Sequence, residues 1–279
     1  MDIAELAQRI LDRHRARVLS RAEERAEHAD PAEVPLPIVQ AGHPALRRRG
    51  QDVLEDQSLI TRDASHEELL AALRLPLPLL QELVQIMTLT MHKAPGVGLA
   101  APQIGLPLRM AVLEDRYARE VEDAEGAVQP HTQTEEDLAH LGSEEEQLER
   151  RPLPLRTLLD PVYEITGSLD VFAFEGCLSV DGWQSIVPRS RTVRVRAVEL
   201  TAEGRLRTID EQHTGWTARI HQHEIDHLAG ILCHDRAVPR SFVEGRWAMR
   251  YDVHEAISRL GLEGDIQHLR PGRVILSRT

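Results

Sequence analysis

The sequence predicts an α+β fold, in which short strands paired in hairpins share a core with a few helices. The strand pattern is clearest at residues 193–197, where Val193, Val195 and Ala197 alternate with arginines, as in a half-buried strand. A turn at residues 202–204 follows, and the next strand runs toward Ile209. Short strands with hairpin signals beside few helix signals indicate this class.

The chain opens with a predicted helix over residues 2–28. The apolar residues that mark it at helical spacing are Ile3, Leu6 and Ile10. Asp30 and Pro31 end it, because the residue before a proline is driven away from helical geometry. An extended stretch at residues 37–39 then leads into a turn at residues 42–47.

A second helix is predicted at about residues 78–92. Its apolar stripe consists of Leu79, Leu80, Leu83, Ile86, Met87 and Met91. Pro95 and Gly96 stop this helix and open a glycine-rich segment, which no G-K-[ST] sequence follows, so it is not a phosphate-binding loop. Residues 109–113 are predicted to form a strand.

The second half resumes the strand pattern at residues 158–161 and continues through the 193–197 hairpin. A third helix is predicted to begin near Gly215 and to end near Gly230. Beyond Asp235 the patterns weaken, and we expect a helix at about residues 253–260 and a final strand at residues 274–276.

Composition narrows the class of protein. A chain of 279 residues fits one large domain, or one domain with extensions. Two cysteines argue against a disulfide scaffold and fit a reducing compartment. The first thirty residues are charged throughout and lack the apolar core of a secretory signal, and no apolar run reaches membrane-spanning length. We therefore expect a cytoplasmic protein with no membrane association and no direct nucleic-acid signal.

Most of the net charge of −12 lies in one acidic segment. Between Glu114 and Arg150 the chain carries thirteen acidic and three basic side chains, and few large apolar ones. Such a segment is too polar to build a core. It is either an acidic interaction arm or a solvated surface loop, and we favour the loop because blocks of charge mostly serve solvation.

The most informative motif is H-E-x-x-H, formed by His223, Glu224 and His227. Residues four apart lie on one face of a helix, so both imidazoles can reach one metal ion. The glutamate can then act as a general base on water. A catalytic metal of this kind usually takes three protein ligands, and the motif supplies two.

Two further motifs accompany it. Residues 96–103 read G-V-G-L-A-A-P-Q, and residues 175–179 read E-G-C-L-S. In this order, ahead of Q-H-E-x-D-H-L, they resemble the peptide deformylase family. The resemblance covers about residues 35–235, with an acidic insertion at about 115–152, and leaves a helical extension at 1–34 and a tail at 236–279. It implies antiparallel β-sheets around a central helix that carries H-E-x-x-H.

The resemblance also implies a reaction and a set of roles. The enzyme would remove the N-formyl group from the formyl-methionine of new polypeptides, releasing formate. One divalent ion would be held by Cys177, His223 and His227. The resemblance implies Fe²⁺, the usual ion of the family, although Zn²⁺, Ni²⁺ or Co²⁺ suit the same ligands. Glu224 would move the proton. The Gln103 amide and the Leu178 N–H would stabilise the oxyanion. Formyl-methionyl nascent chains are the expected partners, with the ribosome as a further candidate.

Substrate contacts are expected from four other residues. They are Val97, Gly98, Trp216 and Ile220. Gly98 would let the substrate approach its backbone. Trp216 and Ile220 share a helical face with His223 and would either wall the methionine pocket or pack in the core.

The chain departs from the family pattern at three positions, which puts substrate-loop details in question. The departures are Asp160, Asp181 and Gln184. Three other residues close to the motifs are expected to be structural. They are His221, Cys233 and His234.

Two rival functions share the same helix. A metalloprotease or other metal-dependent amidase would need a third ligand other than Cys177. A catalytically inactive, metal-stabilised binding module would be expected to close its site with four protein ligands. The intact Glu224 and Gln103 argue against the second.

Overall fold

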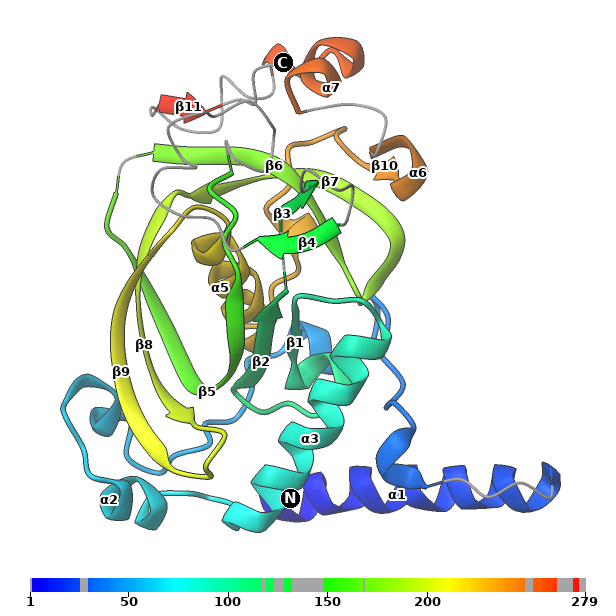
Figure 1. Ribbon diagram of the computed structural model, residues 1–279, viewed down its shortest axis with the longest axis vertical. Coiled ribbons are helices and arrows are strands. Elements are labelled where there is room, and N and C mark those ends of the chain that lie inside the picture. The colour runs from blue at the N-terminus through cyan, green and yellow to red at the C-terminus, as the bar shows by residue number, and fades with distance from the viewer. Residues whose placement is uncertain are drawn as a thin grey trace.

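The structure is a computed structural model, and it describes residues 2–25, 30–116, 119–122, 128–131, 148–167, 169–248, 253–264 and 273–275. Within these ranges no helix is long and apolar enough to cross a membrane. The fold is α+β, as the sequence predicts: antiparallel strands form two main sheets and a few helices pack on or between them (Figure 1).

The first sheet is entirely antiparallel, in the order β1-β2-β5-β8-β9. Its strands are β1 Gly98–Ala100, β2 Met110–Asp115, β5 Leu153–Ile165, β8 Thr192–Leu200 and β9 Leu206–Thr214. The predicted hairpin is formed by β8 and β9, which pair along their whole length. The predicted strand at residues 109–113 is β2, and the one at 158–161 lies within β5.

The second sheet has the order β10-β7-β6-β11. Its strands are β6 Leu169–Cys177, β7 Val180–Ser190, β10 Val243–Glu244 and β11 Arg273–Ile275. Strands β6 and β7 form a hairpin, and Cys177 is the last residue of β6 before the turn. One pairing departs from the expected antiparallel arrangement, because β11 runs parallel to β6.

The helices confirm the predicted positions and add two short ones. Their bounds are α1 Ile3–Arg25, α2 His66–Ala71, α3 Leu77–Lys93, α5 Gly215–Leu228, α6 Gly245–Ala248 and α7 Val253–Leu260. The stripe predicted for α3 is largely buried. The extended stretch at residues 37–39 joins no sheet, although the Val39 N–H donates to the Gln103 carbonyl at 2.8 Å.

Helix α5 lies at the centre, packed against both sheets (Figure 1). Ten of its fourteen residues are buried, and many of these are polar, including Arg219, Gln222, Glu224 and His227. Buried polar groups need partners, so a central helix of this composition indicates a site rather than a simple core.

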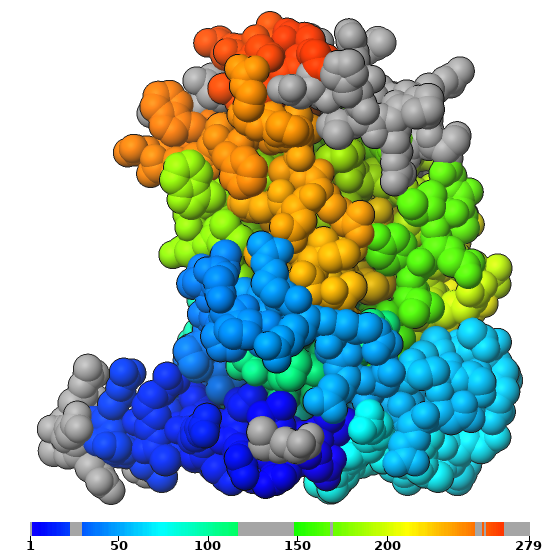
Figure 2. Space-filling model, turned by 180° about the vertical axis from the view of Figure 1, so that it is seen from behind, coloured from blue at the N-terminus to red at the C-terminus, as the bar shows by residue number. Residues whose placement is uncertain are grey.

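Helix α1 shares the largest apolar core with α3. Ile3, Ala7 and Leu11 are buried in the cluster that contains Leu83 and Met87. The rest of the helix extends along one end of the molecule, opposite the end formed by the C-terminal helices (Figure 2). The first turns of α1 therefore pack against α3 in the same core.

The acidic insertion lies between β2 and β5. Part of it falls outside the described residues. The part that is described contains a short hairpin of β3 Arg119–Glu122 and β4 Val128–His131, which pair with each other. Just before β5, Arg150 donates to the buried carboxylate of Asp115 at 2.9 and 3.0 Å, which joins the two ends of the insertion.

Candidate metal centre and active site

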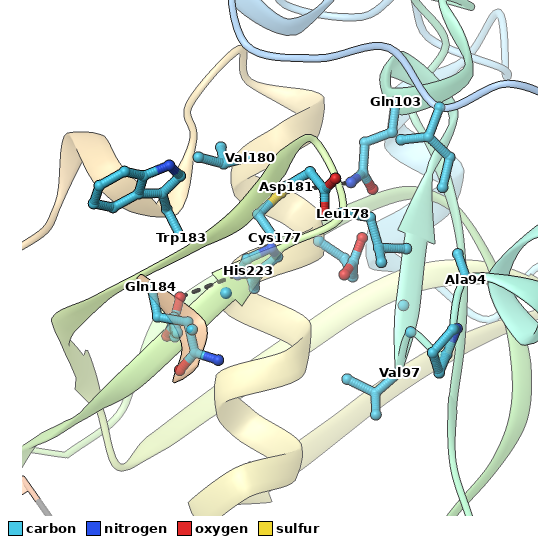
Figure 3. A pocket seen from close by; sticks show the side chains of 18 of the residues that line it. Ala94, Val97, Gln103, Cys177, Leu178, Val180, Asp181, Trp183, Gln184 and His223 are labelled. Atoms are coloured by element: carbon cyan, nitrogen blue, oxygen red, sulfur yellow. Dashed lines mark hydrogen bonds and ion pairs between the residues drawn. The ribbon is translucent and has the colours of Figure 1, made fainter. Parts of the chain in front are cut away.

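Three potential metal ligands meet where the end of β6 faces α5. The Cys177 sulfur and one ring nitrogen each of His223 and His227 lie within 4.8 Å of one another. The distance from Cys177 Sγ to His227 Nε2 is 3.3 Å. The two histidines are one helical turn apart, so α5 presents both rings on the face toward Cys177. Figure 3 shows Cys177 and His223 side by side at the cavity.

This donor set fits a divalent transition-metal ion. One thiolate and two imidazoles suit zinc, iron(II) or cobalt. Burial and the nearby His223 lower the pKa of His227 to about 4, which keeps that imidazole neutral and able to donate a lone pair. Burial alone would lower the pKa of His223, but its hydrogen bonds with Cys177 and Glu175 raise it well above the usual value. The Cys177 sulfur and the Glu175 carboxylate thus stabilise positive charge at His223.

Glu175 orients the His223 ring through a hydrogen bond with Nδ1. Its Oε2 lies 3.0 Å from His223 Nδ1, which leaves Nε2 for the metal side. Arg189 and Arg219 donate to the same carboxylate at 2.6 to 3.0 Å. Burial opposes ionisation of Glu175, but these two arginines hold its pKa well below the usual range. Glu175 stands in the E-G-C-L-S motif but was given no role there. Arg189 and Arg219 were not predicted, because they pair with Glu175 from distant positions in the sequence.

Glu224 is suited to accept a proton. Its side chain is buried beside the two histidines, and Oε2 has no hydrogen-bond partner within the described part of the chain. Burial raises its pKa above the usual value, which brings it closer to that of a general base at neutral pH.

Gly98 leaves room for the Glu224 side chain. A Cβ on Gly98 would lie 2.2 Å from Glu224 Oε1, far inside van der Waals contact. The sequence reading assigned this glycine to substrate approach only. The structure adds a second reason, since the Glu224 side chain lies against the strand at this point.

Gln103 directs its amide nitrogen at the site. Its Oε1 accepts a hydrogen bond from the Ala100 N–H at 2.8 Å, which fixes the orientation of the amide. Its Nε2 then lies 3.6 Å from Cys177 Sγ and 3.3 Å from Ser179 Oγ. A donor held in this way suits an oxyanion.

The loop that carries Leu178 is held by a residue that the sequence reading did not single out. Gln40 donates to the Leu178 carbonyl at 3.0 Å and accepts from the Asp181 N–H at 3.1 Å. The loop conformation between β6 and β7 is therefore set from the N-terminal half of the chain.

A cavity of about 620 Å³ opens over these groups. All four predicted substrate contacts line it: Val97, Gly98, Trp216 and Ile220. Trp216 and Ile220 also pack in an apolar cluster, so they belong both to the core and to the cavity wall. Of the three departures from the family pattern, Asp181 and Gln184 line the cavity (Figure 3).

The third departure, Asp160, has a structural role instead. It is fully buried, with a positive φ of 49°. Its carboxylate accepts hydrogen bonds from the N–H groups of Val53 and Leu54 and from the Gln57 amide, at 2.8 to 2.9 Å. It anchors a loop that does not line the cavity, so the expected link to substrate loops is wrong at this position.

The second cysteine is buried, as expected of a structural residue, but it lies close to the proposed ligands. Cys233 is buried, and its thiol hydrogen bonds to Cys177. This bond is the main cause that lowers the pKa of Cys177 to about 6. His221, in contrast, behaves as expected: it stacks on His213 at 4.2 Å between ring centroids and takes no part in the ligand group.

A central helix with two histidines and a glutamate, a facing thiolate and an adjoining cavity are typical of a metal-dependent hydrolase. A model of the polypeptide deformylase family matches residues 35–242, and the chain belongs to this family. It is an enzyme that removes the N-formyl group from new polypeptides.

Curated relatives agree with this assignment. The chain is 44% identical to peptide deformylase 3 of Streptomyces avermitilis, over 74% of this chain and 73% of that protein. It is 41% identical to peptide deformylase 1 of Streptomyces coelicolor, over 74% and 75% respectively. It is 34% identical to a chloroplastic peptide deformylase 1A of Solanum lycopersicum, over 74% and 60%.

Proposed function

We propose that Cys177, His223 and His227 hold the metal on which deformylation depends, and that Glu224, Gln103 and Leu178 carry out the proton transfer and oxyanion stabilisation. The observation that supports this most directly is the meeting of three donor atoms within 4.8 Å of one another, beside the carboxylate of Glu224. Among the described residues no fourth side chain joins this group, which leaves a position for water or substrate.

The chemistry follows from these positions. A divalent ion, when bound, supplies a Lewis acid that lowers the pKa of water and polarises a carbonyl. Glu224 takes the proton from the attacking water and later delivers it to the leaving amine. Its raised pKa suits both transfers, because the carboxyl must be able to hold the proton between them.

Two donors would stabilise the oxyanion that forms at the formyl carbon. The Gln103 amide is fixed by its bond to Ala100, so its N–H group needs no reorientation as charge develops. The Leu178 N–H belongs to the loop that Gln40 braces. Neither donor titrates near neutral pH, so both remain available throughout the reaction.

The methionine side chain of the substrate would lie in the cavity against Trp216 and Ile220, with the peptide running past Val97 and Gly98. These residues line the cavity next to His223 and Glu224. The protein substrates would be formyl-methionyl nascent chains, met at the ribosome in the cytoplasm. We further infer that catalysis resides in residues 35–235, and that residues 1–34, the insertion at 115–152 and the tail at 236–279 are additions to it.

We propose iron(II) as the physiological ion. A thiolate and two imidazoles with an open position bind a redox-active ion that oxygen can attack. Nickel(II) and cobalt(II) bind such sites at least as tightly and resist oxidation better. We expect the iron(II) form to be fast and air-sensitive, the nickel and cobalt forms to be active and stable in air, and the zinc form to be slow.

The test is to strip the protein, reload it with each metal without oxygen, and follow formate release from a formyl-methionyl peptide before and after exposure to air. A fastest zinc form with an air-stable iron form would contradict this choice of ion. A Cys177→Ala variant that retains its full metal content would instead overturn the ligand assignment and favour the protease-type alternative.

A further inference from the structure

The chain has only two cysteines, and the fold brings them together. Cys177 ends β6, and Cys233 begins the short 3₁₀ helix Cys233–Asp235, which packs against β6 and β7. A side-chain hydrogen bond with Cys233 is the first cause of the lowered pKa of Cys177. Each of the two sulfurs also lies within 4.8 Å of a ring nitrogen of His223. Two cysteines that are 56 positions apart in the sequence thus lie beside the same histidine ring.

The two thiols differ in their access to solvent. Cys177 is half-buried and lines the cavity, whereas only 1% of Cys233 is exposed. Neither is in a disulfide. A small oxidant that enters the cavity therefore meets Cys177 first, and the product of that encounter lies against a protected, reduced thiol. This arrangement is that of an exposed cysteine beside a resolving cysteine.

We propose that Cys233 is a resolving cysteine for Cys177: after a hydroperoxide oxidises Cys177, Cys233 forms a disulfide with it and so prevents irreversible oxidation. The proposal concerns a modification site and rests on the proposed role of Cys177 as a metal ligand only for its effect on activity. While the disulfide is present, the thiolate ligand is lost, and the metal is released.

The reaction balances with a hydroperoxide as the oxidant. The Cys177 sulfur attacks the outer peroxide oxygen, the O–O bond breaks, and sulfenic acid and an alcohol or water form. The Cys233 sulfur then attacks the Cys177 sulfur, the S–O bond breaks, and the departing hydroxide takes the Cys233 proton and leaves as water. Two thiols have given two electrons to one peroxide. A dithiol reductant reverses the bond by thiol–disulfide exchange.

The competing outcome is further oxidation of Cys177 to the sulfinic and sulfonic acids, which dithiols do not reverse. Disulfide formation with Cys233 is favoured because both sulfurs already lie beside the His223 ring, so only a local movement is needed to reach the covalent S–S length of about 2.0 Å. A second peroxide must instead diffuse into the cavity.

The experiment uses the full-length enzyme loaded with nickel, so that iron-driven radical chemistry does not contribute. Wild type, Cys233→Ser and Cys233→Ala are treated with increasing hydrogen peroxide. Free thiols are then alkylated and the digest is analysed by mass spectrometry, while released nickel is followed with a coloured chelator. A subsequent dithiothreitol step with added nickel measures recovery.

We expect a peptide that joins Cys177 to Cys233 in wild type, nickel release in step with it, and recovery of thiol and activity after reduction. In both Cys233 variants Cys177 should pass to the sulfinic and sulfonic acids, with loss of that recovery. Wild type oxidised in urea gives the background level of the cross-linked peptide.

The proposal is overturned if no joined peptide forms above that background, or if Cys177 is overoxidised equally in all three proteins. If a variant fails to fold, the amount of joined peptide in wild type, compared with the background, decides the question. Disulfide formation without nickel release would keep the modification site but remove Cys177 from the metal ligands, so the two hypotheses fail separately.

Discussion

Glu224 is buried, and its Oε2 has no hydrogen-bond partner among the described residues. An unpaired buried oxygen costs free energy, which indicates a chemical task for this carboxylate. Replacement by glutamine keeps the shape and removes the base. We expect Glu224→Gln to retain its metal, because the three proposed ligands are intact, and to lose about 10²- to 10⁴-fold in turnover. Metal analysis beside formate release checks this. Near-normal turnover in the loaded variant would remove Glu224 from the mechanism.

The contact between Gly98 and Glu224 gives a second test of the same base. In Gly98→Ala the new methyl group would lie 2.2 Å from Glu224 Oε1, so the carboxylate must move. We expect turnover to fall by about 10²-fold or more, the usual contribution of a positioned base, with fold and metal content retained. Gly245→Ala is the matched control. It also lines the cavity, but its Cβ would lie 3.7 Å from the nearest atom, an ordinary contact.

The residue scale also shows what the sequence can and cannot predict. Helical spacing alone is enough to bring His223 and His227 together, whereas Cys177 was reached only through the family resemblance. Glu175 stands in the E-G-C-L-S motif but was given no role, Cys233 was expected to be structural, and Gln40 was not singled out. Their contacts join segments that are far apart in the sequence, which local patterns do not reveal.

At the scale of elements, periodic segments were predicted well and irregular ones poorly. Helices α1, α3, α5 and α7 and the β8–β9 hairpin lie where the sequence placed them. Helix α2 was not predicted, since six residues give too little periodicity, although Ser65 and Glu68 form a capping box there. The parallel pairing of β11 with β6 depends on how distant segments dock, which no local pattern encodes.

The acidic insertion contacts the rest of the fold at its two ends. Its hairpin, β3 and β4, pairs only with itself among the described strands. At its ends, however, Asp115 bonds to Arg150, Leu148 packs in an apolar cluster and Glu149 pairs with Arg191. Deleting residues 116–147 and inserting a short Gly/Ser linker should therefore leave a folded, active enzyme.

The wider deletion of residues 115–149 is the matched comparison. It leaves Arg150 without its buried partner, which costs about 3–5 kcal/mol, so we expect a clearly lower melting temperature than for the narrower deletion. Thermal unfolding and formate release from a short formyl-methionyl peptide are measured for both. Equal stability would show that the insertion ends are dispensable, and lost activity in the narrow deletion would point to a lid role.

For the whole molecule, a buried network of charges joins the two sheets through α5. Glu175 of β6 pairs with Arg189 of β7 and with Arg219 of α5. Asp226 of α5 also pairs with Arg189, and it accepts from Tyr163 of β5 in the other sheet. Glu175 of this network also bonds to His223, so the groups that join the sheets position one of the proposed metal ligands.

This coupling predicts how stability depends on pH. The pKa of Glu175 is held well below its usual value in the folded protein. The contribution of its ionised carboxylate to the free energy of unfolding is therefore fully present above about pH 4.3, the unperturbed pKa of glutamate. It is lost as the pH falls toward the folded pKa, because the unfolded chain binds the proton first. At neutral pH, Glu175→Gln should cost about 3–5 kcal/mol, since two buried arginines lose their shared carboxylate.

The free energy of unfolding of wild type and Glu175→Gln is measured by denaturant titration from pH 7 to pH 3. A chelator is present throughout, so that loss of metal does not add its own pH dependence. The difference in the free energy of unfolding between the two proteins should stay constant down to about pH 4.3 and then narrow. Below that pH, acid protonates Glu175 in the wild type, which then carries a neutral side chain, as the glutamine variant does at every pH. A difference that stays unchanged to pH 3 would show that the network does not rely on an ionised Glu175, and the orientation of His223 would then rest on shape alone.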